Sequence, residues 1–300
     1  MERVNLGKWF YDDIRGQWLN KGLAIETRRL ELEFFRRMGV YTKVPRSYAG
    51  GSKVITTRWI DTNKGDQDNS NYRARLVGRE IKTDERPDLF AATPPLESLR
   101  YIISKCASNQ SASKRYCMLS SDIKRAYFYA KAVRPVYIEI PKEDRDPNGG
   151  DKDMVGKLNL SLYGTRDAAQ NLQKEYTSFM TSIGFIVGKA SPCNFYHPTY
   201  EITCTVHGDD FTSLAAEEQL KSMAAQFKKR FEINDKGILG PEAHDLKETR
   251  LLNRIIAWEH EGIRFEADQR HGEILSKQLG LDQTTRGLDL PGTKDTKSDD

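Results

Sequence analysis

Apolar and polar positions divide the first third of the chain into a helix and two strands. The segment "GLAIETRRLELEFFRRM" (22–38) has apolar residues at helical spacing, and Gly39 is a suitable place for the helix to end. Its apolar side is expected to consist of Leu23, Ile25, Leu30, Phe34 and Met38. Two strand-like runs, 54–63 and 72–81, flank the polar segment "KGDQDNSN", and this pattern predicts a hairpin.

The segment from 96 to 231 alternates between further helices and strands. Helices are expected over 96–108, 166–183 and 217–231. The apolar stripes of the first and last of these are Leu96, Leu99, Ile103 and Cys106, and Leu220, Met223, Ala224 and Phe227. From Asp122 onward the order is strand, helix, hairpin, helix, strand, which is typical of an α+β fold with helices on one face of a mostly antiparallel sheet. That arrangement would bring the end of the Asp122 strand beside the hairpin at 203–215.

The tip of this hairpin, "TCTVHGDDFTSLA" (203–215), carries the adjacent pair Asp209 and Asp210. Gly and Asp favour turns because they tolerate unusual backbone angles and form local hydrogen bonds. The pair is therefore consistent with an ordinary polar hairpin tip. The alternative is half of a metal site, which Asp122 would complete.

Composition adds modest constraints. The 300 residues carry a net charge of +4, which permits a nucleic-acid partner without requiring one. The four cysteines form no CxxC pair, and the N-terminal segment lacks the apolar stretch of a signal peptide. No apolar run approaches membrane-spanning length. An intracellular protein without membrane contact is expected, cytoplasmic or nuclear.

Six segments, in order, indicate a family. They are "YRARLVGREI", "LFAATPPLESLR", "SSDIKRAYFYA", "VYIEIP", "KLNLSLYGTRDAAQNL" and "FEINDKGILG". They resemble "YKARLVARG", "TFAPVARLESIR", "MDVKTAFLNG", "VYMEQP", "KLKKSLYGLKQAPRAW" and "FEMKDLGEL" of the reverse transcriptase of copia-type LTR retrotransposons. The resemblance implies fingers and a palm, with a ferredoxin-like antiparallel palm sheet and helices on one face. It also implies three regions: a helical N-terminal extension at 1–42, the reverse transcriptase at 43–281 and a disordered tail at 282–300.

The chain departs from the family at several points. The family's "YVDD" stands here as His207-Gly208-Asp209-Asp210, and Asp167, Ala169 and Leu172 replace the family's Gln, Pro and Trp. The chain ends where the family's ribonuclease H region would begin, and no integrase region is recognised. A fragment of a Pol polyprotein is therefore expected.

The resemblance assigns a catalytic and metal-binding triad to Asp122, Asp209 and Asp210. Two Mg²⁺ ions, or Mn²⁺, would be held by these carboxylates and would assist transfer of a nucleotide to a 3′-hydroxyl. Asp122 and Asp209 are expected to bind directly, with Asp210 adjacent.

The resemblance also implies a nucleotide-binding group. Its members are Arg73, Arg75, Arg125, Ala126, Tyr127, Tyr163 and Gly164. Arg73 and Arg75 would share one strand face and bind triphosphate, since alternate strand residues point the same way. Backbone N–H groups near Arg125 and Ala126 would add to that site, and the Tyr127 ring would exclude a 2′-hydroxyl.

Three functions remain distinct hypotheses. The first is an RNA-directed DNA polymerase, a nucleotidyltransferase acting on an RNA template, a DNA primer and deoxynucleoside triphosphates. The second is a catalytically inactive retrotransposon-derived copy that retains only nucleic-acid binding. The third is an α+β domain unrelated to nucleic acid, whose Asp-Asp pair is a turn.

Overall fold

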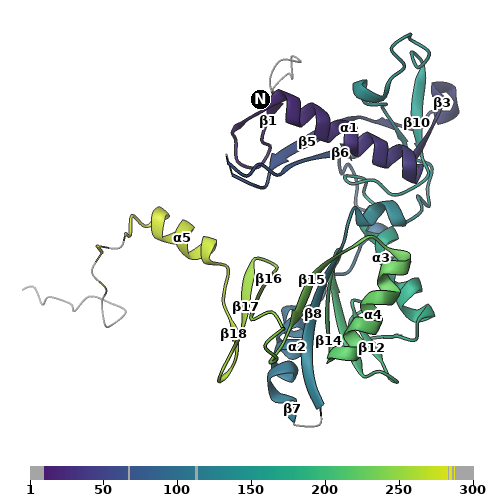
Figure 1. Ribbon diagram of the computed structural model, residues 1–300. Helices are drawn as coiled ribbons and strands as arrows, with labels where there is room; N and C mark the ends of the chain where they lie inside the picture. The colour runs from purple at the N-terminus through teal and green to yellow at the C-terminus, as the bar shows by residue number, and fades with distance from the viewer. Residues whose placement is uncertain (1–9, 67, 112–113, 283, 286, 288–300) are drawn as a thin grey trace, which may run out of the picture. The chain divides into compact units, whose positions relative to one another are not determined.

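The computed structural model of the chain describes residues 10–66, 68–111, 114–282, 284–285 and 287 (Figure 1). The chain divides into two compact units, Met1–Lys236 and Gly237–Asp300. Most of the expected tail, residues 283, 286 and 288–300, lies outside the described residues. All the candidate site residues fall within the first unit.

One part of the first unit combines a helix with three small sheets. Its elements are β1 (Phe10–Tyr11), β2 (Trp18–Leu19), α1 (Lys21–Met38), β3 (Tyr41–Pro45), β4 (Val54–Ile55), β5 (Thr57–Asn63), β6 (Tyr72–Gly78), β9 (Tyr137–Ile138) and β10 (Met154–Leu158), with the short 3₁₀ helices η1 (Arg46–Ala49), η3 (Ala126–Tyr129) and η4 (Lys142–Asp144). Strands β5 and β6 pair as the predicted hairpin, and the four-stranded sheet has the order β3-β10-β9-β4. Side chains from α1, β6 and η3, among them Phe35, Leu76 and Phe128, share one core. Helix α1 is therefore integral to this unit.

The buried face of α1 differs from the predicted one. Three of the expected apolar residues are exposed: Leu23, Ile25 and Leu30. The buried residues are Ala24, Arg28, Glu31, Leu32, Phe34 and Phe35. Arg28 is buried because it binds Asp61, with 2.5 Å between nitrogen and oxygen, and Glu31 because it binds Arg125 at 2.7 Å. Paired charges can occupy an interior, so a charged residue does not mark the solvent side of a helix.

The remainder of the first unit is built on a larger sheet. Its elements are η2 (Pro87–Leu89), α2 (Leu96–Ser108), β7 (Gln110–Ser111), β8 (Lys114–Ile123), α3 (Ala168–Ser182), β11 (Ile186–Val187), β12 (Asn194–His197), β13 (Ile202–His207), β14 (Asp210–Ala216), α4 (Glu217–Arg230) and the first part of β15 (Ile233–Leu239). The first unit ends within β15, at Lys236. The strand order is β11-β12-β13-β14-β8-β15, with antiparallel pairing from β11 through β8, and β7 pairs with β8. Helices α2, α3 and α4 confirm the three predicted from periodicity, and the expected apolar stripe of α4 is buried.

Helices α3 and α4 cover one face of this sheet. The ring of Phe211 on β14 packs edge-on against Tyr176 of α3 and Phe227 of α4, with ring centroids 5.6 and 5.2 Å apart. Phe195 on β12 also contacts Tyr176. Aromatic edge contacts of this kind add to the stabilisation from burial alone.

Helix α2, which precedes Asp122 in the chain, packs on the opposite face, whereas α3 and α4, the two helices of the predicted order from Asp122 onward, share one face. Asn194 and Thr205 are register partners on neighbouring strands, and Thr205 is in turn opposite Thr212. This row points away from Phe211, because successive strand residues alternate in direction. Asn194 donates a hydrogen bond to Ser98 of α2 at 2.9 Å. The five residues 211–215 are all buried, so β14 needs cover on both sides.

The second unit contains β16 (Glu248–Leu251), β17 (Arg254–Glu259), β18 (Gly262–Phe265) and helix α5 (Gln269–Gln278). The strands form an antiparallel meander in chain order. In the described part of the chain, no helix is both long and apolar enough to cross a membrane.

Candidate active site

Three aspartates lie at one end of two neighbouring strands of the larger sheet. Asp122 is the penultimate residue of β8, and Asp210 is the first residue of β14. The backbone register places them opposite each other. Asp210 also pairs with His207 on β13, so Asp209 lies in the turn between β13 and β14. Residues far apart in sequence are therefore neighbours.

The turn that carries Asp209 contains only Gly208 and Asp209. Gly208 has a φ of 66°, and Asp209 is not among the non-glycine residues with positive φ. A positive φ at the first position alone is the pattern of a type II′ hairpin turn, which favours glycine there. The N–H of Ile123 donates a hydrogen bond to the Asp209 carbonyl oxygen at 3.2 Å, which fastens the turn to β8. The segment is a hairpin tip that also holds Asp209 near Asp122.

The surroundings of Asp209 oppose its negative charge. Burial raises the pKa of the Asp209 carboxyl, and the carboxylates of Asp122 and Asp210 raise it further, while a backbone hydrogen bond and Arg75 act in the opposite direction. A bound cation offsets repulsion between such carboxylates. The three aspartates supply oxygen ligands only, which suits hard divalent cations such as Mg²⁺.

Strand β15 brings two further side chains to the aspartates, and sequence reasoning missed both. The Lys236 ammonium lies 2.9 Å from Oδ1 of Asp210, and Asn234 Nδ2 lies 3.5 Å from Oδ2 of Asp122. These side chains lie two residues apart on β15, so they project from the same face of the strand. Spacing in the sequence gave no signal for them, because their position depends on which strand β15 lies beside.

Cationic side chains of the β5–β6 hairpin act on the same site. Arg73 and Arg75 are exposed while Ala74 between them is buried, which confirms that the two arginines share one face of β6. The pKa of Lys64 is lowered, first by partial desolvation and then by Arg73 and Arg75. Asp122 and Asp209 raise that same pKa, so Lys64 lies within the field of both the arginines and the aspartates. Lys64 is another residue that sequence reasoning missed.

Two tyrosines, Tyr127 and Tyr163, interact with both Arg75 and Asp209. The rings of Tyr127 and Tyr163 pack edge-on, with centroids 4.5 Å apart, and the Arg75 guanidinium lies 4.9 Å from the Tyr163 ring centroid. Burial raises the pKa of both phenols, and Asp209 raises each further. The Tyr163 hydroxyl is buried and has no hydrogen-bond partner among the described residues. Tyr127 is half-buried, so part of its ring is open to solvent.

Gly164 holds the segment after Tyr163 against the end of β6. Its φ is 82°, and a Cβ built on it would lie 2.0 Å from the carbonyl oxygen of Gly78. The Gly78 N–H donates to the Tyr163 carbonyl oxygen at 2.7 Å. Only glycine allows this approach, which fixes Tyr163 beside the strand that carries Arg75.

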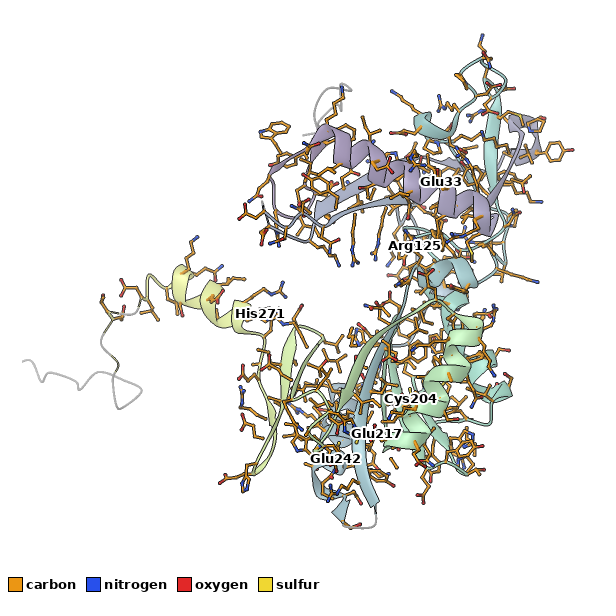
Figure 2. The ribbon with its side chains drawn as sticks, viewed as in Figure 1. Glu33, Arg125, Cys204, Glu217, Glu242 and His271 are labelled. Atoms are coloured by element: carbon orange, nitrogen blue, oxygen red, sulfur yellow. The ribbon has the colours of Figure 1, made fainter. Side chains whose placement is uncertain are left out.

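Arg125 and Ala126 lie where β8 gives way to η3. Arg125, labelled in Figure 2, has a φ of 51°. Its guanidinium binds Glu31 of α1 and lies 4.2 Å from the Phe34 ring centroid. The Arg125 side chain is therefore occupied away from the aspartates. The Ala126 side chain is buried, so only the backbone at these two positions is suited to binding a ligand. Their N–H groups are at the start of η3, where a helix offers no internal acceptor.

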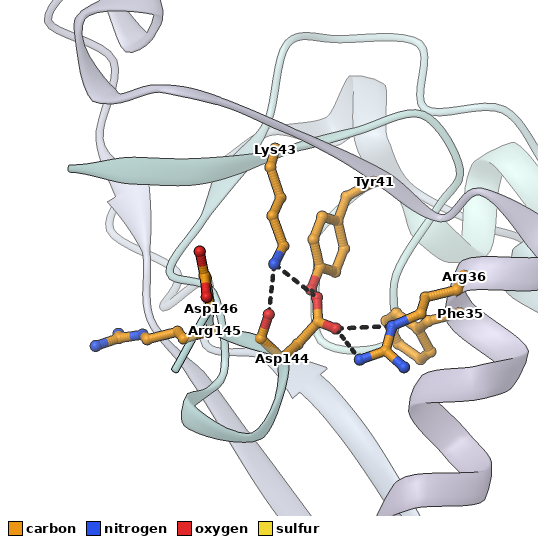
Figure 3. Close-up of a pocket in the computed structure, with 7 residues that line it drawn as sticks. All are labelled: Phe35, Arg36, Tyr41, Lys43, Asp144, Arg145 and Asp146. Atoms are coloured by element: carbon orange, nitrogen blue, oxygen red, sulfur yellow. Dashed lines mark hydrogen bonds and ion pairs between the residues drawn. The ribbon is translucent and has the colours of Figure 1, made fainter. Parts of the chain in front are cut away.

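A separate pocket of about 340 Å³ lies between α1, β3 and η4 and contains none of the predicted site residues (Figure 3). Asp144 lies at its centre, and its carboxylate binds Arg36 and accepts a hydrogen bond from the Tyr41 hydroxyl. Lys43 donates to the Asp144 carbonyl oxygen at 2.5 Å and binds Asp151 at 2.7 Å. Arg36, Lys43 and Asp144 are thus engaged with one another or with Asp151, which is typical of a structural network.

Comparison with known proteins gives the class to which this fold and site belong. The chain belongs to the reverse transcriptase (RNA-dependent DNA polymerase) family, whose model matches residues 40–243. The matched region contains every residue of the candidate site.

Two curated relatives narrow the class. The chain is similar to the "Retrovirus-related Pol polyprotein from transposon TNT 1-94" of Nicotiana tabacum, with 25% identity over 226 residues, or 72% of this chain and 16% of the relative. It is also similar to the "Retrovirus-related Pol polyprotein from transposon RE1" of Arabidopsis thaliana, with 26% identity over 138 residues, or 44% of this chain and 9% of the relative. The matched part of the chain thus spans less than a fifth of either relative. These matches confirm the resemblance to copia-type retrotransposon reverse transcriptases.

Proposed function

We propose that this chain is an RNA-directed DNA polymerase that extends a DNA primer on an RNA template with deoxynucleoside triphosphates. The observation that carries the proposal is the pairing of Asp122 with Asp210 across β8 and β14, with Asp209 in the adjoining turn. Cationic side chains from a different element, the β5–β6 hairpin, act on the same carboxylates. Such a combination suits a reaction in which charge moves on a triphosphate.

The three aspartates are the proposed metal ligands, with Asp122 and Asp209 binding directly and Asp210 beside them. Their fit to Mg²⁺ or Mn²⁺ rests on two features: an all-oxygen ligand set, and a half-buried Asp209 carboxylate whose charge its neighbours oppose. When bound, two such ions make a 3′-hydroxyl nucleophilic and neutralise the departing pyrophosphate. The protein's own contribution is to hold the carboxylates in register.

The triphosphate is proposed to bind Arg73, Arg75 and Lys64, aided by the backbone N–H groups of Arg125 and Ala126. Arginine suits this role because its planar guanidinium donates two parallel hydrogen bonds to phosphate oxygens. Contact with the Tyr163 ring holds the Arg75 guanidinium on the side of β6 that interacts with Asp209.

The sugar of the incoming nucleotide is proposed to lie on the Tyr127 ring. Tyr163 supports this ring from the side, and Gly164 positions Tyr163. A ring held in this way would collide with a 2′-hydroxyl and so exclude ribonucleotides.

The larger sheet is the proposed palm. Its chain order β8, α3, β13, β14, α4 and β15 supports a ferredoxin-like arrangement, with α3 and α4 on one face. The β5–β6 hairpin belongs to the proposed fingers, and α1 of the proposed extension packs against it. The proposed reverse transcriptase region remains residues 43–281, preceded by the extension at 1–42.

Primer extension on poly(rA)·oligo(dT) with Mg²⁺ tests the proposal. Extension is expected from the wild type, whereas Asp122→Asn and Asp209→Asn should each abolish it without unfolding the protein. The matched control is Asp153→Asn. The Asp153 side chain is 86% exposed and immediately precedes β10, which belongs to a different sheet from β8 and β14. Extension retained in either variant would reject the ligand assignment. If the wild type binds an RNA–DNA hybrid in a salt-sensitive way but never extends a primer, the chain is the inactive alternative.

A further inference from the structure

We propose that Lys236 acts as an internal counter-ion that competes with a divalent cation for Asp210. This inference rests on the proposed function, because it takes the three aspartates as the metal ligands. It adds Lys236 as a residue that sets the metal concentration at which the site is half-filled.

The geometry places the ammonium where it neutralises one of the three carboxylates. Lys236 Nζ lies 2.9 Å from Asp210 Oδ1, and both side chains are about three-quarters buried, with 30% and 26% of their surfaces exposed. The lysine reaches Asp210 on β14 from β15, on the far side of β8. Asn234 approaches Asp122 from the same strand, so β15 supplies a cation and a neutral donor to two of the three aspartates.

The sequence marks this lysine as a feature of this chain. When "FEINDKGIL" (231–239) is written beside the family segment "FEMKDLGEL", Lys236 stands in place of leucine and Asn234 in place of lysine. A leucine at this position has no charge to offer Asp210. The Lys236–Asp210 ion pair is therefore absent from a site with leucine at this position. The adjoining turn, at Gly208 and Asp209, also differs from the family segment "YVDD".

The competition follows from like charge. A divalent cation held by the aspartate cluster would lie close to the Lys236 ammonium, and repulsion between them would either weaken metal binding or force the lysine away. Breaking an ion pair of this exposure costs about 1 kcal/mol, which corresponds to about a fivefold change in affinity. The lysine should therefore raise the metal concentration that half-fills the site by about fivefold.

Direct metal binding by the full chain tests the inference without any catalytic readout. Mn²⁺ binding is followed by electron paramagnetic resonance of the free ion for the wild type, Lys236→Met and Lys236→Gln. Both variants should bind Mn²⁺ about fivefold more tightly, and Lys236→Arg should bind as the wild type does. The matched control is Lys228→Met, which removes an exposed lysine that pairs with Asp235 rather than with a proposed ligand. Unchanged or weaker Mn²⁺ binding in both neutral variants would overturn the inference.

The variant Asp209→Asn separates this inference from the proposed function. If Asp209→Asn leaves Mn²⁺ binding intact, the aspartates are not the metal site, and both proposals fail. If it abolishes Mn²⁺ binding while the neutral Lys236 variants bind as the wild type does, only the role of Lys236 is wrong. The metal-induced rise in melting temperature gives a second measurement, and it should be larger for Lys236→Met than for the wild type.

Discussion

Replacement of Gly164 by alanine should destabilise the first unit and disturb nucleotide binding together. The new Cβ would lie 2.0 Å from the Gly78 carbonyl oxygen and 3.1 Å from its carbonyl carbon, against backbone that cannot swing aside as a side chain can. The left-handed backbone angle costs alanine about 1–2 kcal/mol, and relief of the overlap costs about 1–3 kcal/mol more. Movement that also breaks the hydrogen bond from Gly78 to Tyr163 adds about 1 kcal/mol. The expected loss is roughly 3–6 kcal/mol.

Gly149 provides the matched control for this substitution. It has the same φ of 82°, but no atom lies within 4 Å of the position that a Cβ would occupy. Gly149→Ala should therefore cost only the backbone term, about 1–2 kcal/mol. The difference between the two variants isolates the steric effect at Gly164.

Urea unfolding followed by circular dichroism measures both variants, with the free energy taken from the midpoint and slope. In primer extension at permissive temperature, Gly164→Ala should raise the KM for deoxynucleotide, because Gly78 ends the strand that carries Arg75. Gly149→Ala should leave that KM unchanged. Equal destabilisation by the two substitutions would refute the reasoning, since it would mean that the close approach to Gly78 does not constrain the fold.

Three further outcomes are expected. Tyr127→Val should raise ribonucleotide incorporation relative to deoxynucleotide in primer extension, and unchanged discrimination in the folded variant would assign the ring to the core. Gly208→Ala should lower the free energy of unfolding by about 1–2 kcal/mol through its positive φ alone, since nothing lies within 4 Å of the position that a Cβ would occupy; a larger loss in urea unfolding would contradict this reasoning. Burial raises the pKa of Glu31 despite Arg125, so the folded state takes up its proton at higher pH than the unfolded state. Relative to Glu31→Gln, the wild type should therefore gain stability as the pH falls from neutral toward 4.5, the ordinary pKa of glutamate, and a relative loss on acidification would contradict this sign.

Hydrophobic periodicity predicted those elements whose buried faces are apolar. Helix α4 is an example, since Leu220, Met223, Ala224 and Phe227 all point inward. The same reasoning failed for α1, where Arg28 and Glu31 are buried against partners that the helix itself does not contain. Burial of a charged residue depends on a distant partner, and periodicity carries no information about distant partners.

The candidate site likewise contains residues that the sequence predicted and residues that it did not. The order of the family motifs predicted that Asp122 lies beside the Asp209 hairpin, because each of these aspartates belongs to a segment that resembles a family motif. Lys64 and Lys236 belong to no such motif. Lys64 acts on the site through the placement of the β5–β6 hairpin, and Lys236 through the position of β15 beside β8. The position of helix α2 on the opposite face was not predicted, because a strand buried on both sides, such as β14, shows no alternation to reveal which helix covers which side.

The double cover of β14 has a consequence for deuterium exchange. The strand is hydrogen-bonded to β13 and β8 and is buried from 211 to 215, so its amides open to solvent only when the sheet itself comes apart. Gly208, three residues before this stretch, is exposed. We therefore expect a change from fast to slow amide exchange within a few residues, with Asp209 and Asp210 at that boundary. One side of the aspartate cluster is thus anchored in a strand that is covered on both faces, while the other side adjoins an exposed turn.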